Sequence, residues 1–372
     1  MKDDSLLRVL VVDDTIVYRK IVSDILEELP GVEVVGVAHN GKIAMSKIAS
    51  LKPDVLTLDI EMPEMNGLEV LAHMRTEAPD VGAIVLSTLT QKGGDLTMKA
   101  LELGAFDFIT KPETDSMAES REQVKGAIAP MLQAFSRRRE VQKILRGKLR
   151  APTAPVGAAG SVHGSEAMGQ HIATLSERRH KKSEIVAIGV STGGPNALAQ
   201  MLPRLPADIN VPILIVQHMP PLFTASLAKS LDAKCAITVK EADDGEAIAP
   251  NKALIAPGGK QMKVVAGLDG STRIVRVTDD PPENSCKPSV DYLFRSVASH
   301  YVGRATGVIM TGMGADGAKG MALMKKNGAV TIAQDEATCV VYGMPKEAVE
   351  AKAVDVIAPL GKIAEEISRT VQ

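Results

Sequence analysis

Short apolar runs alternate with amphipathic stretches along this 372-residue chain, and this alternation limits the possible folds more than any other feature. Near the N-terminus, the apolar runs with the length of buried strands are Arg8–Val12, Glu33–Val37, Val55–Leu58, Ala83–Leu86 and Phe106–Ile109. Stretches with helical periodicity lie between them, for example Ile16–Glu28 and Lys42–Ser50. Repeated β-α units predict a doubly wound parallel sheet, in which ligands bind beyond the carboxyl ends of the strands.

A second series of β-α units begins at Glu184. Its expected strands are Ile185–Val190, Pro212–Val216, Ala253–Ala256, Gly307–Met310 and Val330–Ala333. The stretches Ser289–His300 and Ala315–Lys326 have helical periodicity, whereas Met262–Val277 alternates around Leu268-Asp269-Gly270-Ser271 and predicts a hairpin. The expected fold class is therefore α/β, with two doubly wound parallel-sheet domains.

The segment between the two series has a different composition. A helical pattern over Val124–Leu149 is rich in Lys and Arg, Ala151–Ser165 is rich in Ala, Pro and Gly, and Arg178–Lys182 is again basic. This pattern is typical of a helix followed by a flexible linker, and contact of the basic run with an acidic partner is the alternative. The expected divisions are residues 6–125, 126–183 and 184–370.

The overall composition excludes several classes of protein. Aromatic residues make up only 2% of the chain and Trp is absent, which suits aliphatic parallel sheets and disfavours base-stacking nucleic-acid readers. A net charge of −2 gives no general attraction to nucleic acid or anionic lipid. The three cysteines are far apart, the N-terminus lacks a signal-peptide pattern, and no apolar run reaches the roughly 18–20 residues that span a bilayer. We expect a cytoplasmic protein.

Polar residues stand at the ends of four expected N-terminal strands. Asp13 and Asp14 follow the first strand, Asp59 ends the third, Ser87 ends the fourth and Lys111 follows the fifth. Singly, each has an ordinary explanation, such as a helix cap or a turn, but together they predict one site. Three adjacent carboxylates repel one another and need a divalent cation, for which oxygen ligands favour Mg²⁺. The cation and Lys111 would neutralise a phosphoryl group on Asp59, and the Ser87 hydroxyl could bond its oxygen.

The sequence around these residues resembles the receiver domains of two-component systems over about residues 6–125. The matching motifs are VVDD at Val11–Asp14, LTLDIEMPEMNG at Leu56–Gly67, VLST at Val85–Thr88 and FDFITKP at Phe106–Pro112. The resemblance implies a flavodoxin-like fold, phosphorylation of Asp59 by a histidine kinase, and Mg²⁺ bound by Asp13, Asp14 and Asp59. It also implies that Ser87 and Phe108 form a switch pair. Asn66 departs from the family, which commonly has an acid there, and we expect little consequence.

A second candidate site begins with GVSTGGP at Gly189–Pro195, which follows an expected strand. Glycines after Ser191 permit a sharp turn that exposes its hydroxyl, which is the logic of a nucleophile elbow, although this run is not the GxSxG elbow in the α/β-hydrolase sense. A dinucleotide loop does not fit, because Ser191 occupies the second glycine position of GxGxxG. Serine needs a base, and His218 follows the next strand; Asp316, in a glycine-rich loop after a later strand, could orient it. Alone, His218 could be a turn histidine and Asp316 a helix cap.

In this arrangement His218 would take the proton of Ser191, and Asp316 would stabilise the imidazolium. The backbone N–H groups of Thr192 and Met313 are the expected oxyanion donors. The order Ser, His, Asp differs from the usual α/β-hydrolases.

The combined motifs resemble the protein-glutamate methylesterases of bacterial chemotaxis over nearly the whole chain. They are GVSTGGP, QHMPP with Phe223-Thr224, IAPGGKQM at Ile255–Met262 and TGMGADGAKGM at Thr311–Met321. The resemblance implies a Rossmann-like three-layer esterase domain with Ser191, His218 and Asp316 as its triad, Thr192 and Met313 at the oxyanion site, and no cofactor.

This family hydrolyses γ-glutamyl methyl esters on methyl-accepting chemotaxis receptors and can deamidate receptor glutamines. Its unphosphorylated receiver covers the esterase site, and a chemotaxis histidine kinase supplies the phosphate. Neither nucleic-acid binding nor membrane insertion is implied. The alternative is a response regulator whose C-terminal half only binds a partner or DNA, and the lack of a helix-turn-helix pattern in a basic domain disfavours DNA.

Overall fold

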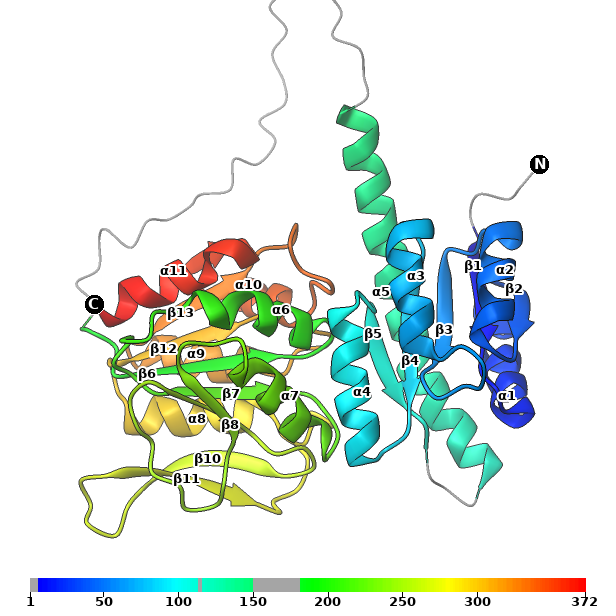
Figure 1. The fold of residues 1–372 in the computed structure, drawn as a ribbon. Helices are drawn as coiled ribbons and strands as arrows, with labels where there is room; N and C mark the ends of the chain where they lie inside the picture. Colours follow the sequence, from blue (N-terminus) through cyan, green and yellow to red (C-terminus); the bar gives the residue numbers. More distant parts are fainter. Residues whose placement is uncertain (1–5, 113–115, 150–180) are drawn as a thin grey trace, which may run out of the picture.

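The computed structural model describes residues 6–112, 116–149 and 181–372, which form two α/β domains placed side by side (Figure 1). The N-terminal sheet has the order β2-β1-β3-β4-β5, and all of its neighbours are parallel. Its strands are β1 (Leu7–Val12), β2 (Val32–Ala38), β3 (Val55–Asp59), β4 (Gly82–Ser87) and β5 (Asp107–Thr110). This order is the flavodoxin-like one, so the doubly wound sheet expected from the alternation is confirmed.

Helices cover both faces of this sheet, which explains why its strands are apolar throughout. One face packs against α1 (Ile16–Glu27) and α5 (Met117–Leu149), and the other against α2 (Gly41–Leu51), α3 (Gly67–Glu77) and α4 (Gln91–Glu102). Asn66 begins α3, because its side chain accepts the Glu69 N–H while Glu69 accepts the Asn66 N–H. The residue that departs from the receiver pattern therefore serves as a helix cap.

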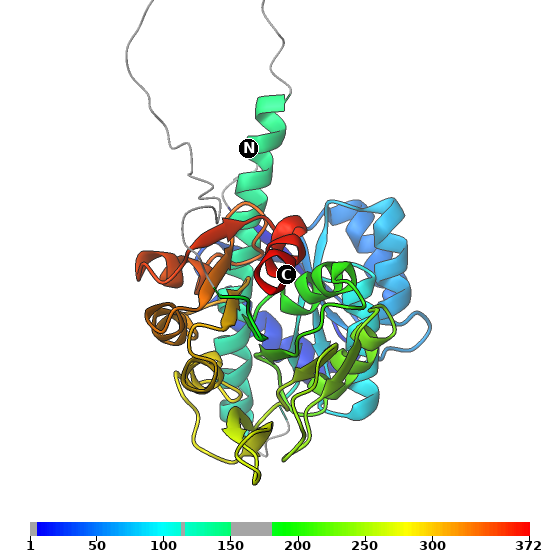
Figure 2. The same cartoon turned by 90° about the vertical axis from the view of Figure 1, so that its left-hand side faces the viewer.

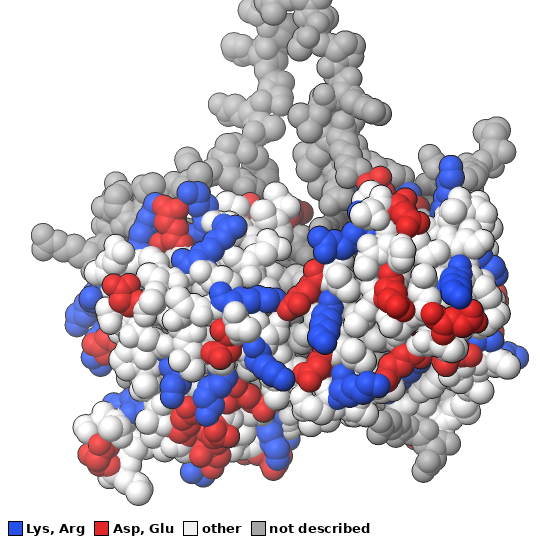
Figure 3. Space-filling model, viewed as in Figure 1, with Lys and Arg blue, Asp and Glu red and all other residues white. Residues whose placement is uncertain are grey.

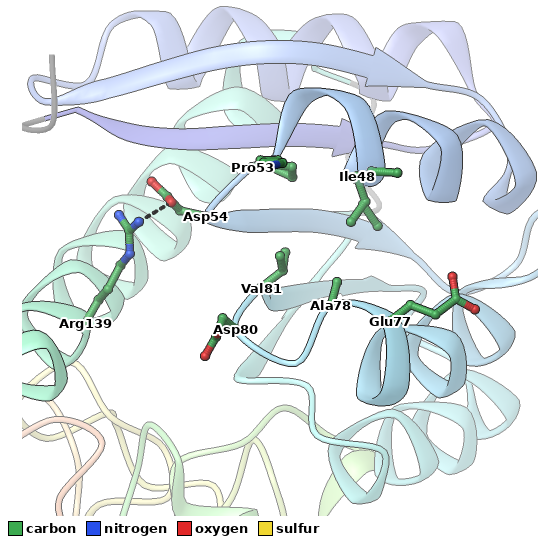
Figure 4. A pocket seen from close by; sticks show the side chains of 10 residues that line it. Ile48, Pro53, Asp54, Glu77, Ala78, Asp80, Val81 and Arg139 are labelled. Atoms are coloured by element: carbon green, nitrogen blue, oxygen red, sulfur yellow. Dashed lines mark ion pairs between the residues drawn. The ribbon is translucent and has the colours of Figure 1, made fainter. Parts of the chain in front are cut away.

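Helix α5 runs through the position where the sequence suggested a division. Ile128 and Leu132 are buried against the N-terminal sheet, whereas the later turns project beyond it (Figure 1). Near the turn where α5 begins to project beyond the sheet, Arg139 forms an ion pair with Asp54, beside a hollow of about 530 Å³ (Figure 4). Asp54 precedes β3, so this hollow lies at the sheet edge opposite Asp59. The expected Ala-, Pro- and Gly-rich linker lies outside the described residues.

The C-terminal sheet has the order β14-β13-β12-β6-β7-β9-β8, again with all neighbours parallel. Its strands are β6 (Ile185–Val190), β7 (Ile213–Gln217), β8 (Thr238–Glu241), β9 (Lys252–Ile255), β12 (Ala305–Ile309), β13 (Val330–Gln334) and β14 (Val356–Ala358). The two edge strands β8 and β14 have four and three residues, too few to show a pattern in the sequence. The predicted hairpin is present as β10 (Gln261–Ala266) and β11 (Arg273–Thr278), an antiparallel pair.

This sheet is also the middle of three layers (Figures 1 and 2). One face packs against α6 (Gly194–Met201), α7 (Phe223–Asp232) and α11 (Leu360–Val371), with the short 3₁₀ turn η2 (Leu202–Arg204) after α6. The other packs against α8 (Val290–His300), α9 (Ala318–Lys326), α10 (Met344–Glu350) and the hairpin. Helix α9 begins three residues later than expected, because Gly317 takes a left-handed φ of 96° at its start.

Acidic and basic side chains are interspersed over both domains on the face shown in Figure 3, so the described residues there form no large patch of one sign. Within the described part of the chain, no helix has the length and apolar character required to cross a membrane.

Candidate functional site

Three strands of the N-terminal sheet bring their polar ends together, as the sequence predicted. Lys111 Nζ lies 2.7 Å from Asp13 Oδ2 and 2.8 Å from Asp59 Oδ2. Asp13 and Asp59 are buried, and Asp14 is exposed beside them. One carboxylate oxygen from each of these three aspartates lies within 4.8 Å of the other two.

The electrostatics of this cluster favour a bound cation. Burial raises the pKa of Asp59 to about 6, and the Asp13 carboxylate adds to this rise while the Lys111 ammonium opposes it. Burial disfavours the charged form of Lys111, but the two carboxylates outweigh it and raise the pKa of the ammonium. One lysine faces three acids, so a divalent cation with oxygen ligands would balance the remaining negative charge. The donor set therefore fits Mg²⁺, for which Asp13, Asp14 and Asp59 would supply the ligands.

The two expected switch residues contact different parts of the molecule. The Ser87 hydroxyl donates to Gly93 O at 3.2 Å and accepts a bond from Thr97 Oγ1 at 2.8 Å, so it is tied to α4. The Phe108 ring stacks on Phe223 of the C-terminal domain, with 5.0 Å between centroids and 1° between planes. Phe108 therefore lies in the contact between the domains, which the motifs alone did not reveal.

The C-terminal candidates lie at the tips of three neighbouring strands. Ser191 follows β6, His218 follows β7 and Asp316 lies in the loop after β12, and the sheet places β12, β6 and β7 in adjacent positions. His218 Nε2 is 2.8 Å from Asp316 Oδ2. Ser191 and His218 both line a hollow of about 260 Å³. Within the described residues, the Ser191 hydroxyl makes no hydrogen bond to His218.

Asp316 is held by several donors besides His218. Its oxygens accept bonds from Ser289 Oγ at 2.8 Å, Asn284 Nδ2 at 2.9 Å, Val290 N at 2.7 Å and Asp291 N at 3.1 Å. The last two are free N–H groups at the start of α8, where the helix dipole also favours a negative charge. The sequence pointed to Asp316 but not to the N–H groups of α8 that hold its carboxylate, because Val290 precedes Asp316 by 26 residues along the chain.

These bonds set the charge states of the pair. Burial works against the Asp316 carboxylate, but His218, Asn284 and the Val290 N–H outweigh it and lower the pKa to about 2. Burial also disfavours the imidazolium of His218, but the bond to Asp316 and the nearby Cys286 thiol outweigh it and raise the pKa to about 9. The Asp316 carboxylate therefore stabilises a proton on His218.

Small and amide side chains bring Ser191 and His218 together. A Cβ at Gly312 would lie only 2.7 Å from Ser191 Cβ, so glycine is needed where the loop after β12 passes the serine. Gln217 Nε2 donates to Ser191 O at 3.0 Å and to His218 O at 3.1 Å. The glycines of this loop indicated a close approach of its backbone, but not that Ser191 is the neighbour, and the two bonds of Gln217 were not predicted.

The expected oxyanion donors are placed near Ser191. Thr192 lines the hollow with Ser191, and Met313 follows Gly312 in the loop that passes it. Among the described residues, the N–H groups of Thr192 and Met313 have no hydrogen-bond partner.

The N-terminal domain forms one wall of this hollow. Residues Asp107, Phe108, Ile109 and Thr110 of β5 line it opposite Ser191 and His218. Further bonds connect α4 to α7: Gln91 Nε2 donates to Ser226 Oγ at 3.1 Å, and Ser226 Oγ donates to Asp95 Oδ1 at 2.7 Å. The structure therefore places a phosphoryl-acceptor type of cluster in one domain and a hydrolase type of cluster in the other, with a shared interface.

Fold and site together define the class of the chain: a response regulator with an α/β output domain that carries hydrolase-type residues. Residues 9–121 match the family model of the response regulator receiver domain, and residues 186–367 match that of the CheB methylesterase. The chain belongs to the family of protein-glutamate methylesterases/protein-glutamine glutaminases, which confirms the resemblance inferred from the motifs.

Curated relatives of that name match over nearly their whole length. One from Desulfotalea psychrophila is 57% identical over 368 residues, covering 98% of this chain and 99% of the relative. One from Trichodesmium erythraeum is 42% identical over 365 residues, covering 98% and 99%. The crystal structure of the Thermotoga maritima CheB methylesterase catalytic domain is 41% identical, with a TM-score of 0.49, and covers 51% of this chain and 99% of that one. The two curated relatives and the methylesterase family model support the enzyme, not the non-catalytic output domain that was the alternative.

Proposed function

We propose that this chain is a phosphorylation-activated serine esterase of the cytoplasm. It hydrolyses glutamyl methyl esters on methyl-accepting chemotaxis receptors and deamidates selected receptor glutamines, and so serves receptor adaptation. The observation that carries the proposal is the 2.8 Å contact of His218 Nε2 with Asp316 Oδ2 beside Ser191, at three adjoining strand tips. The relatives' names supply the substrate class.

The reaction follows from which nitrogen of His218 is free. Asp316 accepts the Nε2–H, so Nδ1, once it has lost its own proton, is the nitrogen that removes the Ser191 proton as the serine oxygen attacks the ester carbonyl. The N–H groups of Thr192 and Met313 stabilise the oxyanion. Methanol leaves with the proton from His218, and a water molecule then cleaves the acyl-enzyme by the same proton transfers in reverse order. With a glutamine substrate, ammonia leaves instead.

The N-terminal domain supplies the control. Asp59 accepts a phosphoryl group from a chemotaxis histidine kinase, and Asp13, Asp14 and Asp59 would hold Mg²⁺, which offsets the negative charge of that group. Lys111 contributes a second cation at the same place. The proposed divisions are residues 6–125 for the receiver, 126–183 for the linker and 184–370 for the esterase.

The interface supports a mechanism in which phosphorylation uncovers the esterase. Ser87 bonds to α4, α4 packs on α7, and Phe108 stacks on Phe223. When Ser87 bonds a phosphoryl oxygen instead of Gly93 O, the α4 contact changes and Phe108 loses its present position. β5 then leaves the hollow, and a receptor segment gains access to Ser191.

The decisive experiment measures methanol release from methylated receptor membranes, with and without a small phosphodonor. Ser191→Ala should abolish turnover while Asp59 still becomes phosphorylated. Ser299→Ala is the matched control, because Ser299 is exposed on α8 and should not alter turnover. Normal turnover by Ser191→Ala would refute the nucleophile. Parallel assays on methyl-ester and glutamine substrates determine which reaction predominates.

A further inference from the structure

Cys286 lies next to the proposed base but takes no part in the proposed reaction. Its Sγ is 3.8 Å from His218 Nδ1. The loop that carries it is fixed by Gln261 Nε2, which donates to Cys286 O at 3.3 Å, and by Asn284 Nδ2, which donates to Asp316 Oδ1 at 2.9 Å. The same carboxylate therefore positions both the imidazole and the loop of the thiol.

The distance between His218 Nδ1 and Cys286 Sγ suits two ligands of one metal ion. Zinc binds sulfur at about 2.3 Å and imidazole nitrogen at about 2.0–2.1 Å, and a tetrahedral angle then puts the two donors about 3.6 Å apart. The observed 3.8 Å is within about 0.2 Å of that separation. The pair can therefore accept such a cation with a very small shift of either side chain.

The other side of the imidazole has the arrangement that metal-binding histidines use. Such a histidine usually donates its second N–H to a carboxylate, which fixes the ring and its tautomer. Asp316 Oδ2 accepts from Nε2 at 2.8 Å, so Nδ1 is the ring nitrogen that faces Cys286 and that offers a lone pair once its proton has left. One donor atom each from His218, Cys286 and Asp316 lies within 4.8 Å of the other two.

We propose that His218 Nδ1 and Cys286 Sγ bind a thiophilic divalent cation such as Zn²⁺, with Asp316 orienting the imidazole. Water or the Ser191 hydroxyl completes the coordination, and the protons of the Cys286 thiol and of His218 Nδ1 pass to the solvent on binding. The bound cation occupies the lone pair that removes the Ser191 proton. Zinc therefore inhibits the esterase; this consequence rests on the proposed function, whereas the binding itself does not.

The chain thus has two sites of different cation preference. Asp13, Asp14 and Asp59 offer only oxygen and suit Mg²⁺, whereas a thiolate and an imidazole favour Zn²⁺ or Co²⁺. Excess Mg²⁺ saturates the first site without occupying the second. The two sites can therefore be separated in one sample.

Binding is tested on the full chain in excess Mg²⁺ with Co²⁺ as the probe, because a cobalt–thiolate bond gives a charge-transfer band in the near ultraviolet. The wild type should show this band with one equivalent of Co²⁺, and Zn²⁺ should displace it. Cys286→Ala should lose the band, and His218→Gln should weaken Co²⁺ binding at least tenfold. The double variant Cys235→Ala, Cys339→Ala should keep it. Absence of the band in the wild type, or its persistence in Cys286→Ala, would overturn the site.

Inhibition is tested by ester hydrolysis, with each rate expressed relative to the same variant's rate without zinc. Zinc should inhibit the wild type reversibly, and a zinc chelator should restore the rate. Cys286→Ala should need at least tenfold more Zn²⁺ for half inhibition, while a matching thermal melt shows that it is folded. Equal sensitivity of both proteins would refute the inhibitory role. If the zinc-free wild type hydrolyses no ester, the proposed function fails, and the cobalt band still decides the site.

Discussion

The carboxylate of Asp107, in the receiver, accepts a hydrogen bond from the backbone N–H of Gly193, two residues beyond Ser191, at 3.0 Å. Its other oxygen accepts the N–H of Phe108 at 2.9 Å, and the side chain is buried. Asp107 thus joins the loop of the proposed nucleophile to the strand that carries Phe108. Because Asp107 and Phe108 are adjacent, a shift of the Phe108 backbone would also displace the acceptor of the Gly193 N–H.

Replacing Asp107 with Ala should raise the activity of the unphosphorylated enzyme. The variant loses the acceptor for the Gly193 N–H, and a buried donor left without a partner in the closed form costs about 1–3 kcal/mol. We expect roughly a tenfold or greater rise in basal methanol release and a smaller response to the phosphodonor. Asp208→Ala, at an exposed position, is the control and should behave as the wild type. An unchanged basal rate would show that this bond does not hold the closed form.

The contact between the domains should strengthen as the pH falls from 7 to 5. Burial raises the pKa of Asp107 to about 6, against the N–H bonds from Gly193 and Phe108. In the open form the group regains water and an ordinary pKa, so the closed form takes up the proton first. The stabilisation of the closed form by protonated Asp107 is complete below the ordinary pKa of 3.8, and it is lost as the pH rises through about 6.

This shift in the pKa of Asp107 should raise the ratio of closed to open form roughly tenfold between pH 7 and pH 5. Hydrogen exchange at the α4–α7 interface measures it without relying on turnover. The Asp107→Ala variant should show a flatter pH profile. A wild-type interface that weakens on acidification would contradict the assignment.

Asp59→Asn should keep basal activity but lose stimulation by a phosphodonor. Asparagine fits the same space, but it is not an acceptor for phosphotransfer, and it removes one carboxylate from the cluster with Asp13 and Lys111. Methanol release with and without acetyl phosphate measures the difference. Asp80→Asn, on the opposite edge of the domain, serves as the comparison and should remain stimulated. Stimulation of the Asp59 variant would exclude Asp59 as the control site.

Asp316→Asn should lower kcat by about 10³–10⁴-fold with little change in KM. The amide group can donate to His218 Nε2, which favours the tautomer with the proton on Nδ1, and that tautomer cannot accept the Ser191 proton. Asn284→Ala, which removes only one of the donors to Asp316, should cost far less. Steady-state kinetics on a soluble methyl-ester substrate provides the comparison. Similar losses of kcat in both variants would indicate that the Asp316 carboxylate only stabilises the local structure and does not set the tautomer of His218.

Much of the fold could be predicted from the sequence because its signals are local. A buried parallel strand is a continuous apolar run, and this property located β1, β3, β4, β6, β7 and β12. Strands β8 and β14 were missed, because edge strands of four and three residues carry too little pattern. Strand-end positions also grouped Asp13, Asp59 and Lys111, since neighbouring parallel strands end at one edge of the sheet.

The sequence by itself determined the two sheets, the side chains at their strand ends, and the family to which the chain belongs. Only the tertiary structure decided how the domains meet: that Asp107 bonds Gly193, that Phe108 stacks on Phe223, and that Cys286 faces His218. Each of these contacts joins segments far apart in the chain, and no local periodicity encodes the partner of a side chain across an interface. The geometry of two packed surfaces selects those partners.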